Sequence, residues 1–355
     1  MIERPSDIVV ALSGGMDSSL AAALLKIAGR HVHGLHFILP APAPTAEARI
    51  EAVQKISHHL KIPLFVMDLK KIFTRQIIDP FIDTYLQGLT PNPCVKCNEL
   101  IKFEYLLQYA VSNNIQSIAT GHYACLKKRD DSSIVDLLRG KDSKKEQSYF
   151  LHRLGQDFLS RAVFPLGEIT KDEARRRARE MNLPTHSIPE SQEICFVPDD
   201  DYRLFVEDKR GAGVNRQGNI VNSRGEIQGE HTGVYKYTIG QRHGLGIASS
   251  RPFYVKEIRP GSNEVVAGRK EELFSRHVKA VDFNWVEGSC CPQKEIAAQT
   301  QLRYRHRPAS GRMRAISSGK INFTFDEPQL AVTPGQALVC YDGERVIGGG
   351  WIRKE

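Results

Sequence analysis

The first half of the chain alternates short apolar runs with segments of helical periodicity, and this alternation constrains the fold more than any other feature. The apolar runs have the length of buried strands and occupy residues 8–12, 31–39, 62–69 and 115–120. The helical segments lie between them, at residues 17–29, 46–60, 72–86 and 98–113. Because neighbouring parallel strands are joined by crossover helices, the sequence predicts an α/β domain built on a parallel sheet.

The sequence pattern changes near residue 205. After a last confident helix, which a Thr170 to Glu173 capping box introduces, glycines recur among short β-branched and aromatic runs up to residue 268. Alternation of apolar and polar residues then continues from residue 275 to the end and favours a compact β-barrel. We therefore expect three domains, which are residues 1–204, a small β domain at 205–272 and a β-barrel at 273–355.

The composition indicates a water-soluble chain without a membrane span. Hydrophobic residues make up 41% of the 355 residues, and no apolar run approaches the roughly 18 residues that a span needs. The amino terminus lacks the apolar core of a secretory signal, and seven cysteines are too few for a disulfide scaffold. We therefore expect a cytoplasmic protein. The net charge of +8 lies mostly in residues 201–355, which carry +7, and this favours either a polyanionic partner or solubility alone.

Residues Ser13 to Ser19, with the sequence SGGMDSS, stand between a predicted strand and a predicted helix. Glycines there let the backbone approach a ligand, and the turn amides and the helix amino terminus face an anion, so the segment predicts a phosphate site. It resembles the pyrophosphate-binding PP-loop of the adenine nucleotide alpha-hydrolase superfamily, whose members cleave ATP between the alpha and beta phosphates. A P-loop kinase is unsupported, because the sequence contains no GxxxxGK[ST] match.

Two further segments carry candidate functional residues. Gly121 and His122 follow a predicted strand, and the carboxyl ends of parallel strands share one edge of a sheet, so both can reach the same nucleotide. Cys94 and Cys97 lie in a proline-stiffened loop before a helix, where the helix amino terminus and Lys96 both favour the thiolate. Cys195 is a third candidate, whereas Cys125, Cys290, Cys291 and Cys340 lie in segments that favour burial.

The motifs together resemble the tRNA-specific 2-thiouridylase family in order and over nearly the whole chain. The matching segments are residues 13–19, 90–93, 97–98, 101–103, 120–123, 147–151, 193–196, 238–242, 244–246, 303–305 and 333–336. The resemblance implies ATP-dependent 2-thiolation of the wobble uridine of tRNA. The C2 oxygen is converted to an adenylate with release of pyrophosphate, and a sulfur nucleophile then displaces AMP.

The resemblance also implies the site residues. ATP with Mg²⁺ is expected at Ala11, Leu12, Ser13, Gly14, Gly15, Met16, Asp17, Ser18, Phe37 and Gly121. The tRNA is expected at Asn92, Pro93, Cys94, His122, Lys145, Glu146, Gln147, Arg303, Tyr304 and Gln336. Catalysis is assigned to Cys195 as the persulfide carrier and to Cys97 as its partner thiol, with the sulfur supplied by a persulfide-carrying protein relay or by sulfide.

The sequence departs from the family at two places. Cys94 stands where well-known members have Asp, and the loop after Phe37 is shortened. With Cys94 present, Cys94, Cys97 and Cys195 match the ligand set of a 4Fe-4S cluster with one open iron, whereas a zinc site lacks a fourth ligand. A cluster-bound hydrosulfide and a plain persulfide relay therefore remain two alternatives for the same thiolation.

Five arginines within residues 303–314 flank Tyr304 and His306. Arginine binds phosphates and an aromatic ring can stack on a base, so the segment predicts RNA binding; the alternative is a solvated strand face. The sequence leaves two rival functions. An amidating synthetase of the same superfamily needs neither the cysteine pair nor the arginines, and a non-catalytic RNA-binding protein with a structural metal leaves the SGGMDSS segment unexplained.

Overall fold

Five strands of the amino-terminal half form a parallel sheet, which confirms the α/β prediction. The computed structural model describes residues 6–41, 45–185, 194–288 and 295–354. Within them the sheet order is β3-β2-β1-β4-β7, and every neighbouring pair is parallel. The strands are β1 Asp7–Ala11, β2 His31–Ile38, β3 Leu64–Asp68, β4 Ser117–Ala119 and β7 Ala162–Val163. The central position of β1 brings its carboxyl end between those of β2 and β4.

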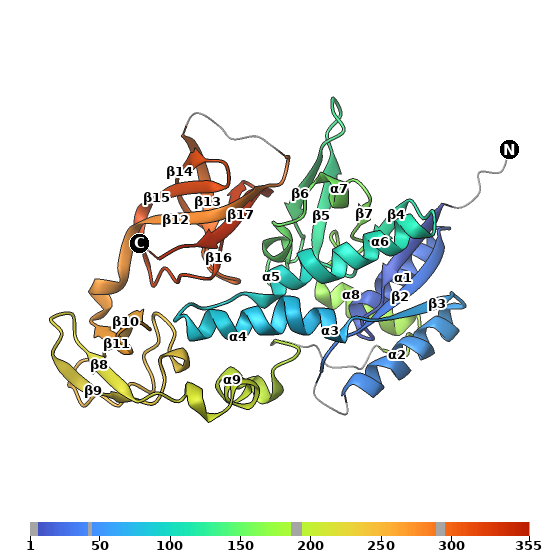
Figure 1. Ribbon diagram of the computed structural model, residues 1–355. Coiled ribbons are helices and arrows are strands. Elements are labelled where there is room, and N and C mark those ends of the chain that lie inside the picture. The colour runs from blue at the N-terminus through green and yellow to red at the C-terminus, as the bar shows by residue number, and fades with distance from the viewer. Residues whose placement is uncertain (1–5, 42–44, 186–193, 289–294, 355) are drawn as a thin grey trace.

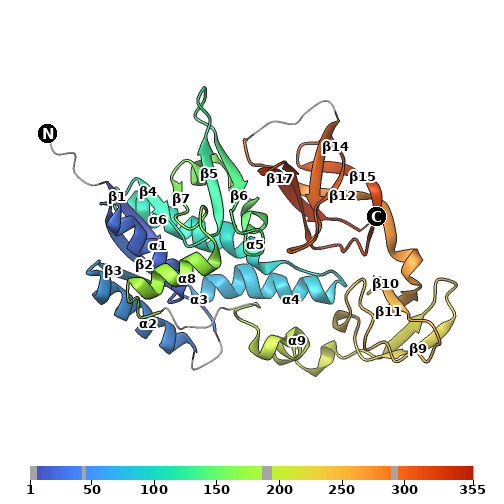
Figure 2. The same ribbon diagram turned by 180° about the vertical axis from the view of Figure 1, so that it is seen from behind.

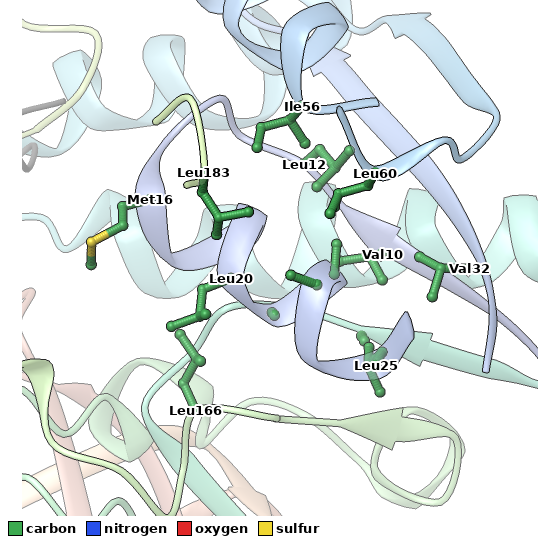
Figure 3. Packing of buried hydrophobic residues seen from close by; sticks show 14 of the residues in the cluster. Val10, Leu12, Met16, Leu20, Leu25, Val32, Ile56, Leu60, Leu166 and Leu183 are labelled. Atoms are coloured by element: carbon green, nitrogen blue, oxygen red, sulfur yellow. The ribbon is translucent and has the colours of Figure 1, made fainter. Parts of the chain in front are cut away.

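Helices pack on both faces of this sheet because β1 is apolar on both sides. Ile8 and Val10 join a buried cluster with α1, α2 and α8, whereas Val9 joins the cluster that contains α6. Figure 3 shows Leu20 of α1 beside Leu166 and Leu183 in the first cluster. The helices are α1 Met16–Ile27, α2 Thr45–Leu60, α3 Lys70–Phe73, α4 Asp79–Leu86, α5 Pro93–Cys97, α6 Glu104–Ser112, α7 Gln156–Leu159, α8 Lys171–Glu180 and α9 Tyr202–Arg210.

Two of the predicted helices are longer than expected and contain a π-helical segment. Thr74–Ile78 joins α3 to α4, and Asn98–Phe103 joins α5 to α6. The second helix begins at Pro93, so Cys94 and Cys97 lie within α5 rather than in the loop that precedes it. The Thr170 Oγ1 atom accepts the Glu173 amide at the start of α8, while the Glu173 carboxylate pairs with Arg177, so half of the predicted capping box forms.

The carboxyl-terminal half consists of two β units, as the glycine-rich and alternating patterns predict. A four-stranded sheet has the order β10-β11-β8-β9. Six further strands form a closed antiparallel barrel, because β12 pairs with both β15 and β17. The strands of the small sheet are β8 Gly218–Val221, β9 Ile227–His231, β10 Tyr254–Arg259 and β11 Glu264–Gly268. The barrel strands are β12 Phe274–Trp285, β13 Ile296–Gln301, β14 Ala309–Ser317, β15 Lys320–Leu330, β16 Ala337–Asp342 and β17 Arg345–Ile352.

Both β units contact the α/β domain. The hairpin of β5 (Ala124–Lys128) and β6 (Val135–Arg139) meets the barrel where Leu138 pairs with Arg345 of β17. Beyond α4, Gly88 packs so closely on Ile258 and Pro260 of the small β unit that an added Cβ would lie 2.8 Å from each. Figures 1 and 2 show α4 extending from the α/β domain toward the small β unit. The barrel lies above α4 in both views. None of the helices in these described ranges has the length and apolar character to cross a lipid bilayer.

Candidate active site

The SGGMDSS segment forms the turn between β1 and α1, at the carboxyl edge of the sheet. Gly14 has a φ of +85°, which an L side chain rarely adopts. The Ser18 hydroxyl accepts the Ser13 amide at 3.1 Å and donates to the Gly15 carbonyl at 3.1 Å, so it fixes the turn from inside. The turn therefore has the shape of a nest whose backbone amides can face a phosphate.

The predicted nucleotide-binding residues around this turn differ in how deeply their side chains are buried. Leu12 and Met16 are buried in the cluster beneath α1 (Figure 3), so only their backbones can contribute to a nucleotide site. Ala11 is partly buried at the end of β1. Phe37, at the carboxyl end of β2, is partly buried and packs against the apolar clusters of both α6 and α4. The structure thus brings the predicted nucleotide residues together from β1, α1 and β2.

Gly121 lies directly against the SGGMDSS turn. An added Cβ would lie 2.7 Å from the Asp17 carbonyl carbon and 2.8 Å from the Ser18 nitrogen. These are backbone atoms that cannot turn away as a side chain can. Only glycine therefore fits at the end of β4 with the turn in this position.

His122 follows Gly121 and is held in its neutral form. Its Nδ1 atom lies 2.7 Å from the Thr120 hydroxyl, and its ring stacks on Phe103 at a centroid distance of 5.8 Å. Burial, with a smaller contribution from the Lys102 ammonium, lowers the pKa of His122 to about 3. At neutral pH His122 can accept or donate a hydrogen bond, but it carries no charge with which to hold a phosphate.

The cysteine segment begins with a side-chain cap. The Asn92 side chain accepts the Val95 amide at 3.4 Å and so starts α5 after Pro91. Val95 and Cys97 are buried on the inner side of α5, whereas Cys94 is exposed to solvent. The Asn98 amide group donates to the Phe150 carbonyl at 3.2 Å and ties the end of α5 to the segment after Gln147.

The cysteine pKa values move in the direction opposite to our expectation. Burial is the largest cause and raises the pKa of Cys94 to about 11 and that of Cys97 to about 12. Cys97 is buried, whereas Cys94 has an exposed side chain. The prediction that Lys96 favours the thiolate is wrong, since its ammonium lies over the Trp351 ring, 5.6 Å from the centroid.

Lys102 is the cation that the structure places near the cysteines, and our sequence reasoning did not single it out. Its charge lowers the pKa of both Cys94 and Cys97, although burial outweighs that effect. The π-helical segment that follows α5 carries Lys102 one turn beyond Cys97. A cation five residues after a cysteine is a weak sequence signal, because an ordinary α-helix would place that side chain on another face.

Cys195 approaches the other two cysteines. Its charge raises the pKa of both Cys94 and Cys97, which requires the three sulfurs to share one region. Phe196 anchors this position, since its ring packs edge-on against Phe73 and Phe81 in the cluster that also contains Cys97. Residues 186–193, which include Glu193 of the family motif, lie outside the described residues.

The spacing of the three sulfurs is wider than a single metal ion requires. Among the described residues, Asp7, His31 and His33 form the one group of potential ligands whose donor atoms all lie within 4.8 Å of one another. They lie at the amino end of the sheet, away from the SGGMDSS turn, and Asp7 is 2.5 Å from His31 as in a hydrogen bond. A four-iron cluster binds each cysteine sulfur to a different iron atom, so its ligand sulfurs need not lie within 4.8 Å of one another.

Of the remaining cysteines, Cys340 is buried as predicted and Cys125 is partly buried, while Cys290 and Cys291 lie outside the described residues.

The barrel holds the loop that precedes α5. The Gln336 amide group donates to the carbonyls of Thr90 and Pro91, both at 3.1 Å, and the Thr90 amide donates to the Pro334 carbonyl at 3.0 Å. Gly335 lies against Thr90 so closely that an added Cβ would be 2.8 Å from its oxygen. The Gln336 side chain, which we predicted to contact tRNA, thus fixes the loop that precedes α5.

The remaining predicted tRNA residues gather beside this junction. The Tyr304 ring packs at a tilt against Phe150 with ring centroids 4.5 Å apart, and the charges of Lys145 and Glu146 both act on the Tyr304 hydroxyl. Glu146 is buried and pairs with Arg139 at 2.8 Å, while the Gln147 side chain accepts the Tyr123 amide at 3.0 Å. These two residues thus shape the loop rather than project from it.

The five arginines of this segment divide between a loop and a strand, since Arg312 and Arg314 lie on the exposed face of β14, as the strand-face alternative expects, whereas the other three lie in the loop before it. This loop connects β13 to β14, and Arg303, Arg305 and Arg307 are exposed along it. Burial and the Arg303 charge lower the pKa of the neighbouring His306 to about 4, so His306 is neutral at pH 7. Three exposed guanidinium groups on one loop can contact successive phosphates.

We predict that Gly121→Ala weakens ATP binding by at least about tenfold, because the added methyl group must displace the SGGMDSS backbone. Equilibrium binding of an ATP analogue measures the loss. Gly155→Ala is the matched control, since nothing lies within 4 Å of a Cβ at that position. Equal affinity in both variants would show that the turn does not form the nucleotide site.

Comparison with known proteins gives one consistent family. Three family models match the chain, described as the tRNA methyl transferase HUP domain at residues 6–199, the tRNA methyl transferase PRC-barrel domain at 205–269 and the aminomethyltransferase beta-barrel domain at 275–352. They follow one another along the chain in the order of its three structural units.

Close relatives extend the match to nearly the full length. The tRNA-specific 2-thiouridylase MnmA of Carboxydothermus hydrogenoformans is 43% identical over 98% of this chain and 97% of its own. That of Acidithiobacillus ferrooxidans is 43% identical over 97% of both chains, and that of Geobacter metallireducens is 43% identical over 97% of this chain and 96% of its own. The chain described here therefore belongs to the tRNA-specific 2-thiouridylase family.

Proposed function

We propose that this protein catalyses the ATP-dependent 2-thiolation of a uridine in tRNA. The observation that carries the proposal is that the SGGMDSS turn, here called the nucleotide turn, and the cysteines Cys94 and Cys97 lie near the same few residues. Gly121 touches the turn, His122 follows it, and the charge of Lys102 acts on His122, Cys94 and Cys97 alike. A uridine bound between the nucleotide turn and the cysteines can have the same C2 position activated by ATP from one side and attacked by sulfur from the other.

The first step is the activation of the uridine C2 oxygen. This oxygen attacks the alpha phosphorus of ATP, the bond to the beta phosphate breaks, and pyrophosphate leaves. The amides of the SGGMDSS turn and the amino terminus of α1 support the departing pyrophosphate charge. The oxygen is now part of an adenylate, which makes it a good leaving group.

The second step transfers sulfur. We assign a persulfide to Cys195, which is exposed, and the partner thiol to Cys97, which is buried nearby. The terminal sulfur attacks C2 and AMP leaves with the original oxygen. Cys97 then attacks the Sγ atom of Cys195, the S–S bond between that atom and the transferred sulfur breaks, and the transferred sulfur stays on C2. The Cys97–Cys195 disulfide that forms must be reduced by an external thiol before the next turnover. A persulfide-carrying protein is the donor that this route requires.

A 4Fe-4S cluster is the second candidate for the sulfur step, and the convergence of three cysteines favours it. Cys94, Cys97 and Cys195 would hold the cluster, and Lys102 supplies a positive charge beside an anionic group. When bound, such a cluster offers an open iron for hydrosulfide. Sulfide would then be the donor, and the rest of the site would act as described above.

Thiolation accounts for the site better than methyl transfer, which the descriptions of the family models name. Methyl transfer needs neither a pyrophosphate nest nor a set of convergent cysteines. The relatives' own names state 2-thiolation. An amidating synthetase of the same superfamily leaves the three cysteines and the arginine loop without a role.

We expect Asp17→Ala and Ser18→Ala each to abolish ATP-dependent thiolation, because the first removes the acceptor of the Tyr123 and Lys171 hydrogen bonds and the second removes the hydroxyl that fixes the turn. Binding of tRNA should stay nearly intact, because the turn and the arginine loop are separate surfaces. Thiolated nucleoside is measured by mass spectrometry after digestion of the tRNA, and tRNA binding by filter retention. Unchanged thiolation in both variants would remove the nucleotide turn from the reaction.

Replacement of Cys94 separates the two sulfur routes. In the persulfide route, Cys94→Asp should retain substantial turnover, aerobically and without iron, while Cys97→Ala and Cys195→Ala are inactive, because two thiols are sufficient. In the cluster route, loss of any of the three cysteines should remove iron and activity together. Iron and acid-labile sulfide are assayed after anaerobic purification. Iron-dependent activity in the parent chain alone would reject the persulfide route.

Replacement of Arg303 and Arg305 by Ala should weaken tRNA binding and lower the slope of its logarithmic salt dependence by about two units, one for each lost phosphate contact. The control replaces Arg175 and Arg176 on α8, where each arginine pairs with an acidic residue of the same helix. A slope that matches the control variant would show that the loop is only a solvated surface.

A further inference from the structure

A lysine that our sequence reasoning did not single out contacts the nucleotide turn. The Lys171 ammonium donates to both carboxylate oxygens of Asp17 at 2.7 Å, and the Tyr123 hydroxyl donates to one of them at 2.8 Å. Lys171 is 4% exposed, whereas about a third of the Asp17 side chain is exposed. The carboxylate thus has its buried partner on the protein side and solvent on the other side.

The start of α8 fixes where this ammonium lies. Lys171 is the first residue of α8, and its backbone amide donates to the Asp142 carboxylate at 2.9 Å. Ala174 and Ala178, one and two turns later, are buried against the cluster that contains α1. Backbone and packing therefore hold Lys171 against the turn, and the side chain need not be ordered by a ligand.

The negative charge of Asp17 opposes phosphate binding at the turn, and the Lys171 ammonium neutralises that charge. A carboxylate in the first turn of α1 lies where the helix terminus and the turn amides should attract phosphates, and it repels them. A buried ammonium cancels that charge and holds the carboxylate by two hydrogen bonds. Without it, Asp17 would be an uncompensated negative charge beside the polyphosphate site.

We propose that Lys171 is a positioning residue of the nucleotide site, which neutralises and orients Asp17 so that the triphosphate of ATP can bind at the SGGMDSS turn. The inference rests on the proposed function and adds to it a residue outside the nucleotide turn. Lys171 acts through Asp17. Its removal should therefore matter only while the Asp17 charge is present.

The test is a double-mutant cycle read out as ATP affinity in the full-length chain. The probe is α,β-methylene-ATP with Mg²⁺, which cannot be cleaved at the bond that the reaction breaks. The variants are Lys171→Met, Asp17→Asn and the double variant, with Lys171→Arg as the conservative change. Arg176→Met is the matched control, because Arg176 lies on the same helix and is paired with Glu180 at the surface.

We expect Lys171→Met to raise the Kd of the probe at least about tenfold, with Lys171→Arg intermediate and Arg176→Met equal to the parent. In the Asp17→Asn background the same Lys171→Met change should alter Kd less than about threefold, since the charge to be compensated is gone. Thermal unfolding of each variant confirms that it is folded. Should Lys171→Met alone not fold, the comparison of Asp17→Asn with the double variant still applies.

Two results would overturn the inference. One is a Lys171→Met variant that binds the probe as the parent does, and the other is an equally large Lys171 effect with and without the Asp17 charge. Both differ from a failure of the proposed function, in which the parent chain itself would not bind the probe or would not thiolate tRNA.

Discussion

The contact between Gly121 and the SGGMDSS turn joins the two halves of the site. Parallel strands end at the same edge, so the loops after β1 and β4 meet there, but they meet this closely only because position 121 lacks a side chain. His122 is thereby placed next to the nucleotide turn on one side and the helix of the cysteines on the other. A site that must carry out both activation by ATP and sulfur transfer depends on this close approach.

Much of the fold and part of the site could be predicted from local sequence. Strand and helix alternation gave the parallel sheet, because buried strands and amphipathic helices have different periods. The nucleotide turn was predictable because its glycines and hydroxyl groups determine the conformation of the backbone within a few residues of themselves. The roles of Lys102 and Lys171 were not predictable in this way. Lys102 reaches the cysteines through a π-helical segment, and Lys171 meets Asp17 across 154 positions of sequence, so both depend on tertiary packing.

The cysteines show why local reasoning about reactivity fails. A helix amino terminus and a neighbouring lysine favour a thiolate when water surrounds the site. In the folded chain Cys97 is packed among apolar rings, and Lys96 points away toward Trp351, so the cost of burying charge prevails. Burial therefore favours the protonated form of the Cys94 and Cys97 thiols. A persulfide, whose outer sulfur is more acidic than a thiol, and metal-bound thiolates are two ways in which sulfur chemistry can begin at such a site.

The barrel contributes to the chemistry by holding the loop before the cysteines. Gln336 and Pro334 bond to the backbone of Thr90 and Pro91, and Trp351 lies beneath Lys96 on α5. The arginine loop of the same barrel contains Tyr304, whose ring packs at a tilt against Phe150, and the Phe150 carbonyl accepts the Asn98 side chain at the end of α5. The barrel thus contacts the loop at the amino end of α5 and, through Tyr304 and Phe150, the segment bonded to the carboxyl end of that helix. The positions of Cys94 and Cys97 therefore depend on packing between two domains and not on the α/β domain alone.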